Sequence, residues 1–296
     1  MVTLLSLLSM NCFAQQQVMF TQYMFNNLAI NPGYAGTTDA LSVTALARRQ
    51  WVGVDGAPNT QTLATHAAIP NTRVGVGLLF VRDAIGISEE NTLIASSAYK
   101  LQIAEGKTLS MGLQAGFSSY THDYTDLGII DDDKFLLSSS LLVPNIGFGL
   151  FYHSERLYAG FSAPYLLNRK LRNASVDLST EQIRHFYAQG GYVFDINPSL
   201  KLRPHLLLKM VPGAPVETDI SANFIYKDLL WMGAAYRSLD AVNFLFQVQA
   251  SDQFRVGYAY DYTLSELNQV TSGSHEIMVQ YVFSFSKHSM VTPRYF

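Results

Sequence analysis

The chain has 296 residues, of which 48% are hydrophobic and only 15% are charged, and its net charge is −3. Soluble proteins usually carry about a quarter charged residues, so the composition argues against an ordinary soluble domain, and the lack of a basic stripe argues against nucleic-acid binding. No apolar run approaches the roughly 20 residues that a membrane-spanning helix needs. The 18 Phe, 17 Tyr and 2 Trp residues favour a membrane β-barrel over a large soluble β-protein, because such barrels carry aromatic girdles at both interfaces.

Residues 1–14 are typical of a signal peptide. An apolar stretch from Leu4 to Leu8 is followed by Cys12 and Ala14, which place small residues three and one before a cut ahead of Gln15. Lipidation of Cys12 is an alternative, although Asn11 stands where a lipidation signal prefers Gly or Ala. Cleavage removes the only cysteine, so the mature chain is predicted to contain no disulfide and no thiolate metal site.

Residues 15–40 form an N-terminal segment that lacks the alternation of a strand. Within it, Thr21–Ile30 is predicted to form a short helix with Met24 and Leu28 along one side, and Asn31-Pro32-Gly33 ends this helix. Three roles are open for the segment: a periplasmic leader, a plug inside a barrel, or a docking arm for a partner.

From residue 41 to residue 286 the sequence alternates between apolar and polar residues. In Leu109–Phe117 every second residue is apolar, and the residues between are small or polar, so a strand here has one apolar and one polar face. Strands of this kind suit a closed barrel in lipid, where every backbone group is paired internally. The prediction is an all-β fold, a transmembrane antiparallel up-and-down β-barrel of about 14 strands, at residues 41–49, 60–69, 73–82, 91–101, 107–118, 145–153, 156–164, 185–196, 199–210, 218–227, 229–237, 241–250, 253–263 and 275–286.

The connections between the predicted strands alternate in length. Those after even-numbered strands are short, as at Asn197-Pro198 and Lys227-Asp228, and those after odd-numbered strands are mostly long, as at Ser119–Pro144, with Ser238–Asp240 as the exception. Outer-membrane barrels have short periplasmic turns and longer extracellular loops. An even number of strands therefore predicts both chain ends in the periplasm, with residues 287–296 as a periplasmic tail.

Four groups of residues spread along the chain carry a resemblance to a known family. They are Gln22–Asn27 with Ile30–Gly36, then Arg49–Gly53 with Asp55–Gln61, then Ser272–Met278, and the terminal Pro293-Arg294-Tyr295-Phe296. In this order they resemble the signature segments of the PorP/SprF family of outer-membrane proteins, which are linked to type IX secretion and gliding motility. Gly33 departs from the pattern, since the family more often has Ala there.

The resemblance implies a non-enzymatic outer-membrane component that acts in export or surface anchoring of a secreted protein. The partners it implies are a secreted type IX substrate or adhesin with a C-terminal sorting domain, components of the translocon or its periplasmic ring, and outer-membrane lipid. An outer-membrane channel or transporter for a small or hydrophobic solute is the alternative function, with residues 15–40 as its plug.

The motif residues are the candidates for partner binding. Trp51 has a second interpretation as an interfacial membrane anchor beside the turn-forming Asp55-Gly56. His275 and Glu276 begin a strand, so they are predicted to face opposite sides of the sheet. The candidate residues are Tyr23, Asn31, Pro32, Trp51, Asp55, Pro58, His275, Glu276, Pro293, Arg294, Tyr295 and Phe296.

Charged residues also fall on the polar, inward face of the predicted strands. Arg203 and His205 lie in a basic stripe that also contains Lys201 and Lys209, and Arg255 shares an inward face with Asp261. These residues are predicted to form a paired charge network that keeps the interior rigid. The alternative is a path for an anionic solute or a seat for an acidic segment.

No catalytic, cofactor or metal site is predicted. The three carboxylates of Asp131–Asp133 lack the alternate-position ligands and the glycine of an EF-hand loop, so a solvated acidic loop is the preferred interpretation. The neighbouring Phe135–Val143 is predicted to form a constriction, a pore-covering helix or a partner contact. The sequence contains no Gly-x-Ser-x-Gly elbow and no His-Glu-x-x-His motif.

Overall fold

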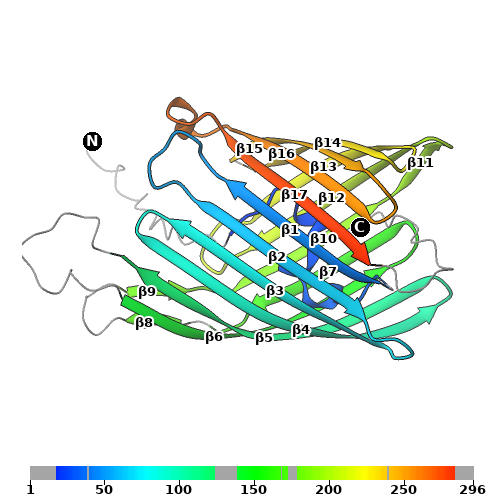
Figure 1. The fold of residues 1–296 in the computed structure, drawn as a ribbon, viewed down its shortest axis with the longest axis horizontal. Coiled ribbons are helices and arrows are strands. Elements are labelled where there is room, and N and C mark those ends of the chain that lie inside the picture. The colour runs from blue at the N-terminus through cyan, green and yellow to red at the C-terminus, as the bar shows by residue number, and fades with distance from the viewer. Residues whose placement is uncertain are drawn as a thin grey trace, which may run out of the picture.

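The computed structural model shows a closed antiparallel β-barrel of 14 strands (Figure 1). The structure describes residues 18–38, 40–123, 139–167, 169–172, 179–238 and 240–283. The described part of the chain contains no helix that is long and apolar enough to cross a membrane.

The barrel strands follow one another around the wall in chain order, and β1 pairs with β17 to close one seam. At the other seam β10 pairs with both β7 and β12. The barrel strands are β1 (Leu41–Arg49), β2 (Asn59–Ala68), β3 (Val74–Ile85), β4 (Ser88–Ala104), β5 (Lys107–His122), β6 (Ser139–His153), β7 (Leu157–Tyr165), β10 (His185–Tyr192), β12 (Leu200–Met210), β13 (Glu217–Tyr226), β14 (Leu230–Arg237), β15 (Ala241–Gln249), β16 (Phe254–Thr263) and β17 (Ser274–Phe283).

The predicted strands match these elements, although β3, β4 and β5 extend three or four residues beyond the predicted bounds and two larger differences occur elsewhere. The sixth strand begins at Ser139 rather than residue 145, so the second half of the predicted constriction, Phe135–Val143, is wall rather than loop. The predicted strand 185–196 divides into β10 and a short β11 (Phe194–Asn197) around the buried Val193. The loop after β7 contains a hairpin of β8 (Arg169–Arg172) and β9 (Ser179–Gln182).

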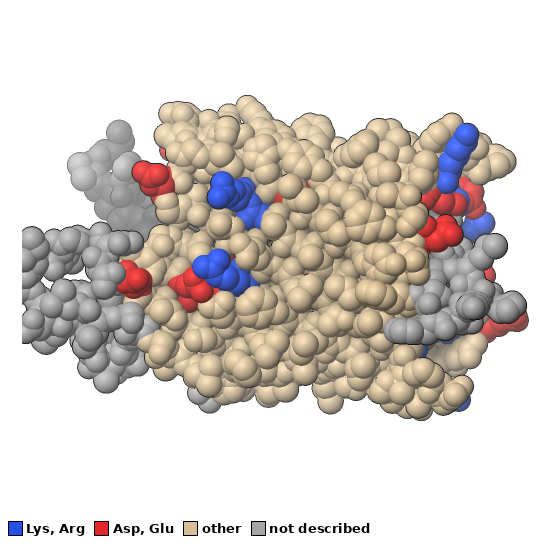
Figure 2. Space-filling view, in the orientation of Figure 1, with Lys and Arg blue, Asp and Glu red and all other residues tan. Residues whose placement is uncertain are grey.

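The outer face of the wall is apolar and the inner face is polar. On β5, Leu113 is 70% exposed on the outside, whereas the adjacent Gln114 is 6% exposed on the inside. Figure 2 shows charged side chains near the two ends of the barrel and a broad uncharged band between them. This band is the surface that an outer-membrane barrel presents to lipid.

The two ends of the barrel differ in their connections. The short turns lie at one end, here called the inner mouth, and include the turn at Lys227 and Asp228, whose φ angles are 51° and 54°. The long connections lie at the other end, the outer mouth, and one of them carries the single-turn 3-10 helix η6 (Glu266–Gln269). Outer-membrane topology places the inner mouth in the periplasm and the outer mouth outside the cell.

The described residues 18–38 of the N-terminal segment lie inside the barrel (Figure 1). Instead of one helix over Thr21–Ile30, it forms three single-turn 3-10 helices, η1 (Tyr23–Phe25), η2 (Asn27–Ala29) and η3 (Pro32–Tyr34). An isolated helix this short is marginal, and here the backbone N–H groups of Thr21 and Gln22 bond to the barrel wall instead.

Candidate functional site: a plug held across the lumen

Residues 18–38, here called the plug, cross the lumen from the outer to the inner mouth. At one end Met19 contacts Lys209, one residue before the outer end of β12. At the other end the carbonyl of Gly36 accepts a hydrogen bond from Lys100 Nζ at 3.0 Å, near the inner end of β4. The described part of the N-terminal segment therefore begins near the outer mouth, whereas the N-terminal end itself, which is predicted to be periplasmic, lies outside the described residues.

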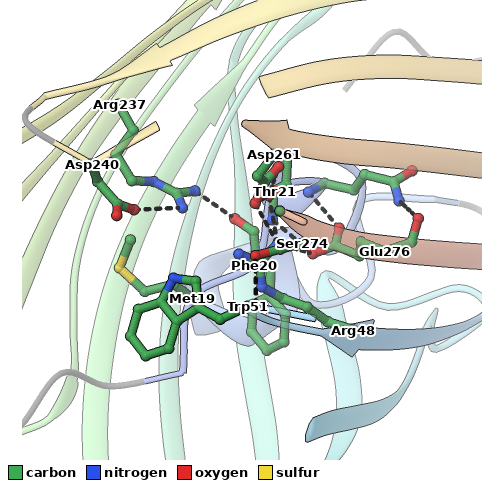
Figure 3. A network of polar contacts seen from close by, with 12 residues as sticks. Met19, Phe20, Thr21, Arg48, Trp51, Arg237, Asp240, Asp261, Ser274 and Glu276 are labelled. Carbon is green, nitrogen blue, oxygen red and sulfur yellow. Dashed lines mark hydrogen bonds and ion pairs between the residues drawn. The ribbon is translucent and has the colours of Figure 1, made fainter. Parts of the chain in front are cut away.

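A group of polar residues, here called the outer latch, holds the beginning of the plug (Figure 3). The Glu276 carboxylate accepts the backbone N–H of Thr21 at 2.8 Å and that of Gln22 at 2.7 Å. Its side chain is fully buried. A carboxylate that accepts two buried N–H groups satisfies donors that would otherwise lack partners.

Two charged residues complete the outer latch. Arg48 Nη1 lies 2.6 Å from Asp261 and 3.4 Å from Glu276, and all three side chains are at most 3% exposed. The Thr21 hydroxyl accepts a hydrogen bond from Arg48 at 2.8 Å and donates to Asp261 at 2.7 Å. The latch is thus formed by Thr21 and Gln22 of the plug with Arg48, Asp261 and Glu276 of the wall.

A second charge group sits beside the latch. Arg237 Nε is 3.1 Å from Asp219, and Arg237 Nη1 is 3.4 Å from Asp240. Arg237 Nη2 also donates to the Phe20 carbonyl at 3.4 Å, so this group contacts the plug as well as the wall (Figure 3).

The middle of the plug is held by aromatic rings. Phe25 packs edge-on against Trp231 with 5.3 Å between ring centroids. The Tyr23 hydroxyl hydrogen-bonds with His205 Nδ1 at 3.2 Å. The guanidinium groups of Arg203 and Arg255 lie 5.0 and 4.9 Å from the Trp231 ring, within the range of a cation–π interaction.

The inner part of the plug is held mainly by close packing, and Asn31 is its centre. Asn31 Oδ1 accepts the Gly33 N–H at 2.8 Å, and its Nδ2 donates to the Leu150 carbonyl at 3.0 Å. Wall glycines allow this approach: a Cβ at Gly112 would overlap the backbone of Pro32 and Gly33. Comparable overlaps would arise at Gly75, Gly149 and Gly160.

Above the latch, two outer loops are joined by backbone hydrogen bonds. Val52 donates to the Gly273 carbonyl, and Ser272 donates to the Val52 carbonyl, both at 2.8 Å. The backbone N–H of Trp51 donates to Ser274 Oγ at 3.1 Å. The β1–β2 loop and the β16–β17 connection therefore form one unit at the outer mouth.

The structure separates the candidate residues into two groups. Tyr23, Asn31, Pro32 and Glu276 are buried and hold the plug in place. Asp55 is exposed and Pro58 is partly exposed in the outer loop. Trp51 sits at the base of that loop, and Pro293, Arg294, Tyr295 and Phe296 lie outside the described residues. A partner-binding role for all of them stays a prediction.

His275 and Glu276 face opposite sides of β17, as their adjacency predicts. His275 Nδ1 hydrogen-bonds with the Tyr258 hydroxyl at 2.7 Å on the outer face, whereas Glu276 points into the lumen. The predicted interior charge pairing is present in part. Lys201 pairs with Asp228 at 2.7 Å and Lys209 pairs with Glu217 at 3.0 Å.

Sequence reasoning missed the outer latch. Thr21 and Arg48 received no site role, because nothing in the sequence connects residue 21 with residues 48, 261 and 276. The only signal in the sequence was that β1, β16 and β17 each carry a charged residue on the inward face, namely Arg48, Asp261 and Glu276. Asp131–Asp133 lies outside the described residues, and within the described ranges no group of three or more His, Cys, Asp or Glu side chains is arranged to hold a metal ion.

Comparison with known protein families places this chain in one of them. The model of the family described as "Type IX secretion system membrane protein PorP/SprF" matches residues 12–281. The chain belongs to this family. Three of the four resembling groups of residues lie within the match, and in the structure they meet at the plug, the outer latch and the joined outer loops. A search of curated proteins finds no match.

Solved structures confirm the barrel fold. The "CymD monoaromatic hydrocarbon channel" has a TM-score of 0.52 and 12% identity, covering 89% of this chain and 94% of that one. The toluene transporter TbuX of Ralstonia pickettii has a TM-score of 0.51 and 11% identity, covering 86% of this chain and 92% of that one. At these identities the likeness shows the fold alone. Together with the family, it identifies this protein as an outer-membrane barrel of the type IX secretion system.

Proposed function

We propose that this family member assists the export or surface anchoring of a partner secreted protein, such as an adhesin with a C-terminal sorting domain. The observation that carries the proposal is the joining of the Arg49–Gly53 and Ser272–Met278 segments at the outer mouth. The bonds between Val52, Ser272 and Gly273 hold these loops in one arrangement. A rigid surface loses little conformational entropy when it binds a partner.

The filled lumen supports the same proposal. The plug residues Gln22, Met24 and Asn31 are each 0% exposed, so the chain itself occupies space that an open pore would leave to water. The surfaces that remain for a partner are the two mouths and the loops around them. We place the secreted partner at the outer mouth, and components of the secretion machinery at the inner mouth.

Co-purification from the native outer membrane tests this function. The tagged protein is extracted in mild detergent, and the chains that accompany it are identified by mass spectrometry. A secreted protein with a type IX sorting domain, or components of the translocon, would support the proposal. Recovery of the barrel alone, under conditions that keep other translocon complexes intact, would contradict it.

A channel or transporter is the second candidate. The observation in its favour is the polar wall behind the plug, where Ser96, Ser110 and Ser221 are buried and face the lumen, as an aqueous path requires. Reconstitution in liposomes distinguishes the two functions. Solute entry through the wild-type barrel would favour transport, whereas entry only after the latch is broken would show that the plug closes an otherwise passable barrel.

A further inference from the structure

Positive and negative charges are unequally distributed along the lumen. The inward carboxylates Asp219, Asp261 and Glu276 all lie within three residues of the outer ends of their strands. Arg203 and Arg255 instead lie close to the inner ends, at the fourth residue of β12 and the second of β16. Among the described residues, the inner half of the lumen therefore carries an excess of positive charge.

Arg255 is the clearest case. It is 7% exposed, and its Nε donates to Gln249 Oε1 at 2.7 Å. Its guanidinium lies over the Phe25 and Trp231 rings, at 5.6 and 4.9 Å from their centroids. Within the described ranges Arg255 forms no ion pair, although a buried charge is costly without a partner.

Arg255 lies near the inner mouth, beside two partly exposed glutamines. These neighbours are Gln249 and Gln280, and Gln280 lies opposite Arg255 in the β16–β17 register. Arg203 shares the same two aromatic rings, at 4.8 and 5.0 Å from their centroids, and adds to the positive potential. The side-chain amides of Gln249 and Gln280 already donate to Ser251 and to Ser42 and Thr44, so the two guanidinium groups supply the donors. Two guanidinium groups between aromatic walls make a suitable seat for a carboxylate.

We propose that Arg255 and Arg203 form a carboxylate-binding site on the inner side of the plug, with Gln249 and Gln280 at its border. An occupant bound there lies against Phe25 of the plug and Trp231 of the wall, so its presence is coupled to the position of the plug. Its carboxylate has two possible sources. One is a small organic acid from the periplasm, and the other is the segment that follows Phe283, since β17 ends at the same mouth.

Trp231 provides the reporter for a test. The chain has only two Trp residues, so the full-length Trp51→Phe variant leaves Trp231 as the single indole fluorophore, 4.9 Å from the Arg255 guanidinium. This variant, purified in detergent, is titrated with glutarate, and with glutaramide as an uncharged probe of the same length. We expect a saturable fluorescence change with glutarate and none with glutaramide.

Further variants in the Trp51→Phe background distinguish the two sources of the carboxylate and provide the control. Arg255→Gln should weaken glutarate binding at least about tenfold, as loss of a charge-assisted contact predicts. Arg73→Gln alters an exposed arginine of an inner-mouth turn and should leave binding unchanged. If glutarate acts only after residues 287–296 are deleted, the C-terminal segment of the chain is the natural occupant.

Two outcomes would overturn the proposal. One is the lack of a saturable glutarate response both in the full-length protein and in the protein without residues 287–296. The other is a response that Arg255→Gln leaves intact. Neither outcome depends on the identity of a secreted partner, so this test and the co-purification experiment fail independently.

Discussion

The two ends of the plug are held by different physical means. At the outer end, Glu276 and Arg48 bind Thr21 and Gln22 through directed hydrogen bonds, and Arg48 is held by an ion pair with Asp261 of the wall. At the inner end, glycines such as Gly112 bring the wall backbone against Pro32 and Gly33. Hydrogen bonds and ion pairs stop stabilising the plug when one partner is removed. Close packing, here called the steric seat, is instead disrupted when a side chain adds volume.

This difference suggests how the plug responds to a partner. Hydrogen bonds and ion pairs can be exchanged for equivalent bonds with another molecule, and the outer latch lies next to the loops proposed to bind the secreted protein. Close packing depends on the shapes of both surfaces, and another molecule cannot easily replace it. The inner end of the plug is therefore suited to remain in place. The outer end is therefore the better candidate for release, and the inner end for a fixed anchor.

The largest expected effect comes from removing the central carboxylate of the latch. Glu276→Ala leaves the N–H groups of Thr21 and Gln22 without acceptors and removes one of the two carboxylates beside Arg48. Breaking a buried pair in this way costs about 3–5 kcal/mol. Urea unfolding of the refolded protein in detergent measures the loss, and planar-bilayer recordings should detect a new conductance.

The matched control for this change is Glu266→Ala, which removes an exposed carboxylate from the η6 connection. Its unfolding midpoint and its conductance should equal those of the wild type. Equal destabilisation by both substitutions would show that the latch contributes no more than an ordinary surface carboxylate.

At the inner end, Gly112→Ala tests the steric seat. The added Cβ overlaps the backbone of Pro32 and Gly33, and such overpacking costs about 1–3 kcal/mol. Gly190→Ala is the control, because a Cβ there meets only the Tyr158 carbonyl at 3.5 Å, an ordinary contact. If Gly112→Ala unfolds at the same urea concentration as Gly190→Ala, the seat is not close-packed.

A smaller loss is expected when Asn31 is changed to Ala. The substitution removes the acceptor of the Gly33 N–H and the donor to the Leu150 carbonyl, which together are worth about 1–2 kcal/mol. Unfolding in urea reports this loss, and Gln102→Ala, on an exposed part of β4, serves as the reference. A stability equal to the reference would rule out Asn31 as an anchor of the plug.

The smallest change in stability is expected at the outer loop. Asp55 is exposed, so Asp55→Ala should shift the free energy of unfolding by no more than about 0.5 kcal/mol. If the loop binds the secreted partner, the same variant should recover less of that partner in the co-purification experiment. Full recovery would remove Asp55 from the proposed binding surface.

The sequence by itself determined the wall of the barrel. Alternation of the kind seen in Leu109–Phe117 predicts which residues face lipid, because a strand turns successive side chains to opposite faces. The alternation of short and long connections predicts which end is the outer mouth. The same rule predicts that His275 and Glu276 diverge, as they do.

Only the tertiary structure decided what fills the barrel. Thr21 reaches Glu276 across 255 positions of sequence, and such a contact depends on closure of the barrel between β1 and β17 rather than on any local pattern. The pairing of Gly112 with Pro32 likewise needs both backbones in place. Local sequence signals indicate where a strand forms and which face each side chain takes. The direction and anchoring of the plug instead depend on contacts that exist only after the wall has closed.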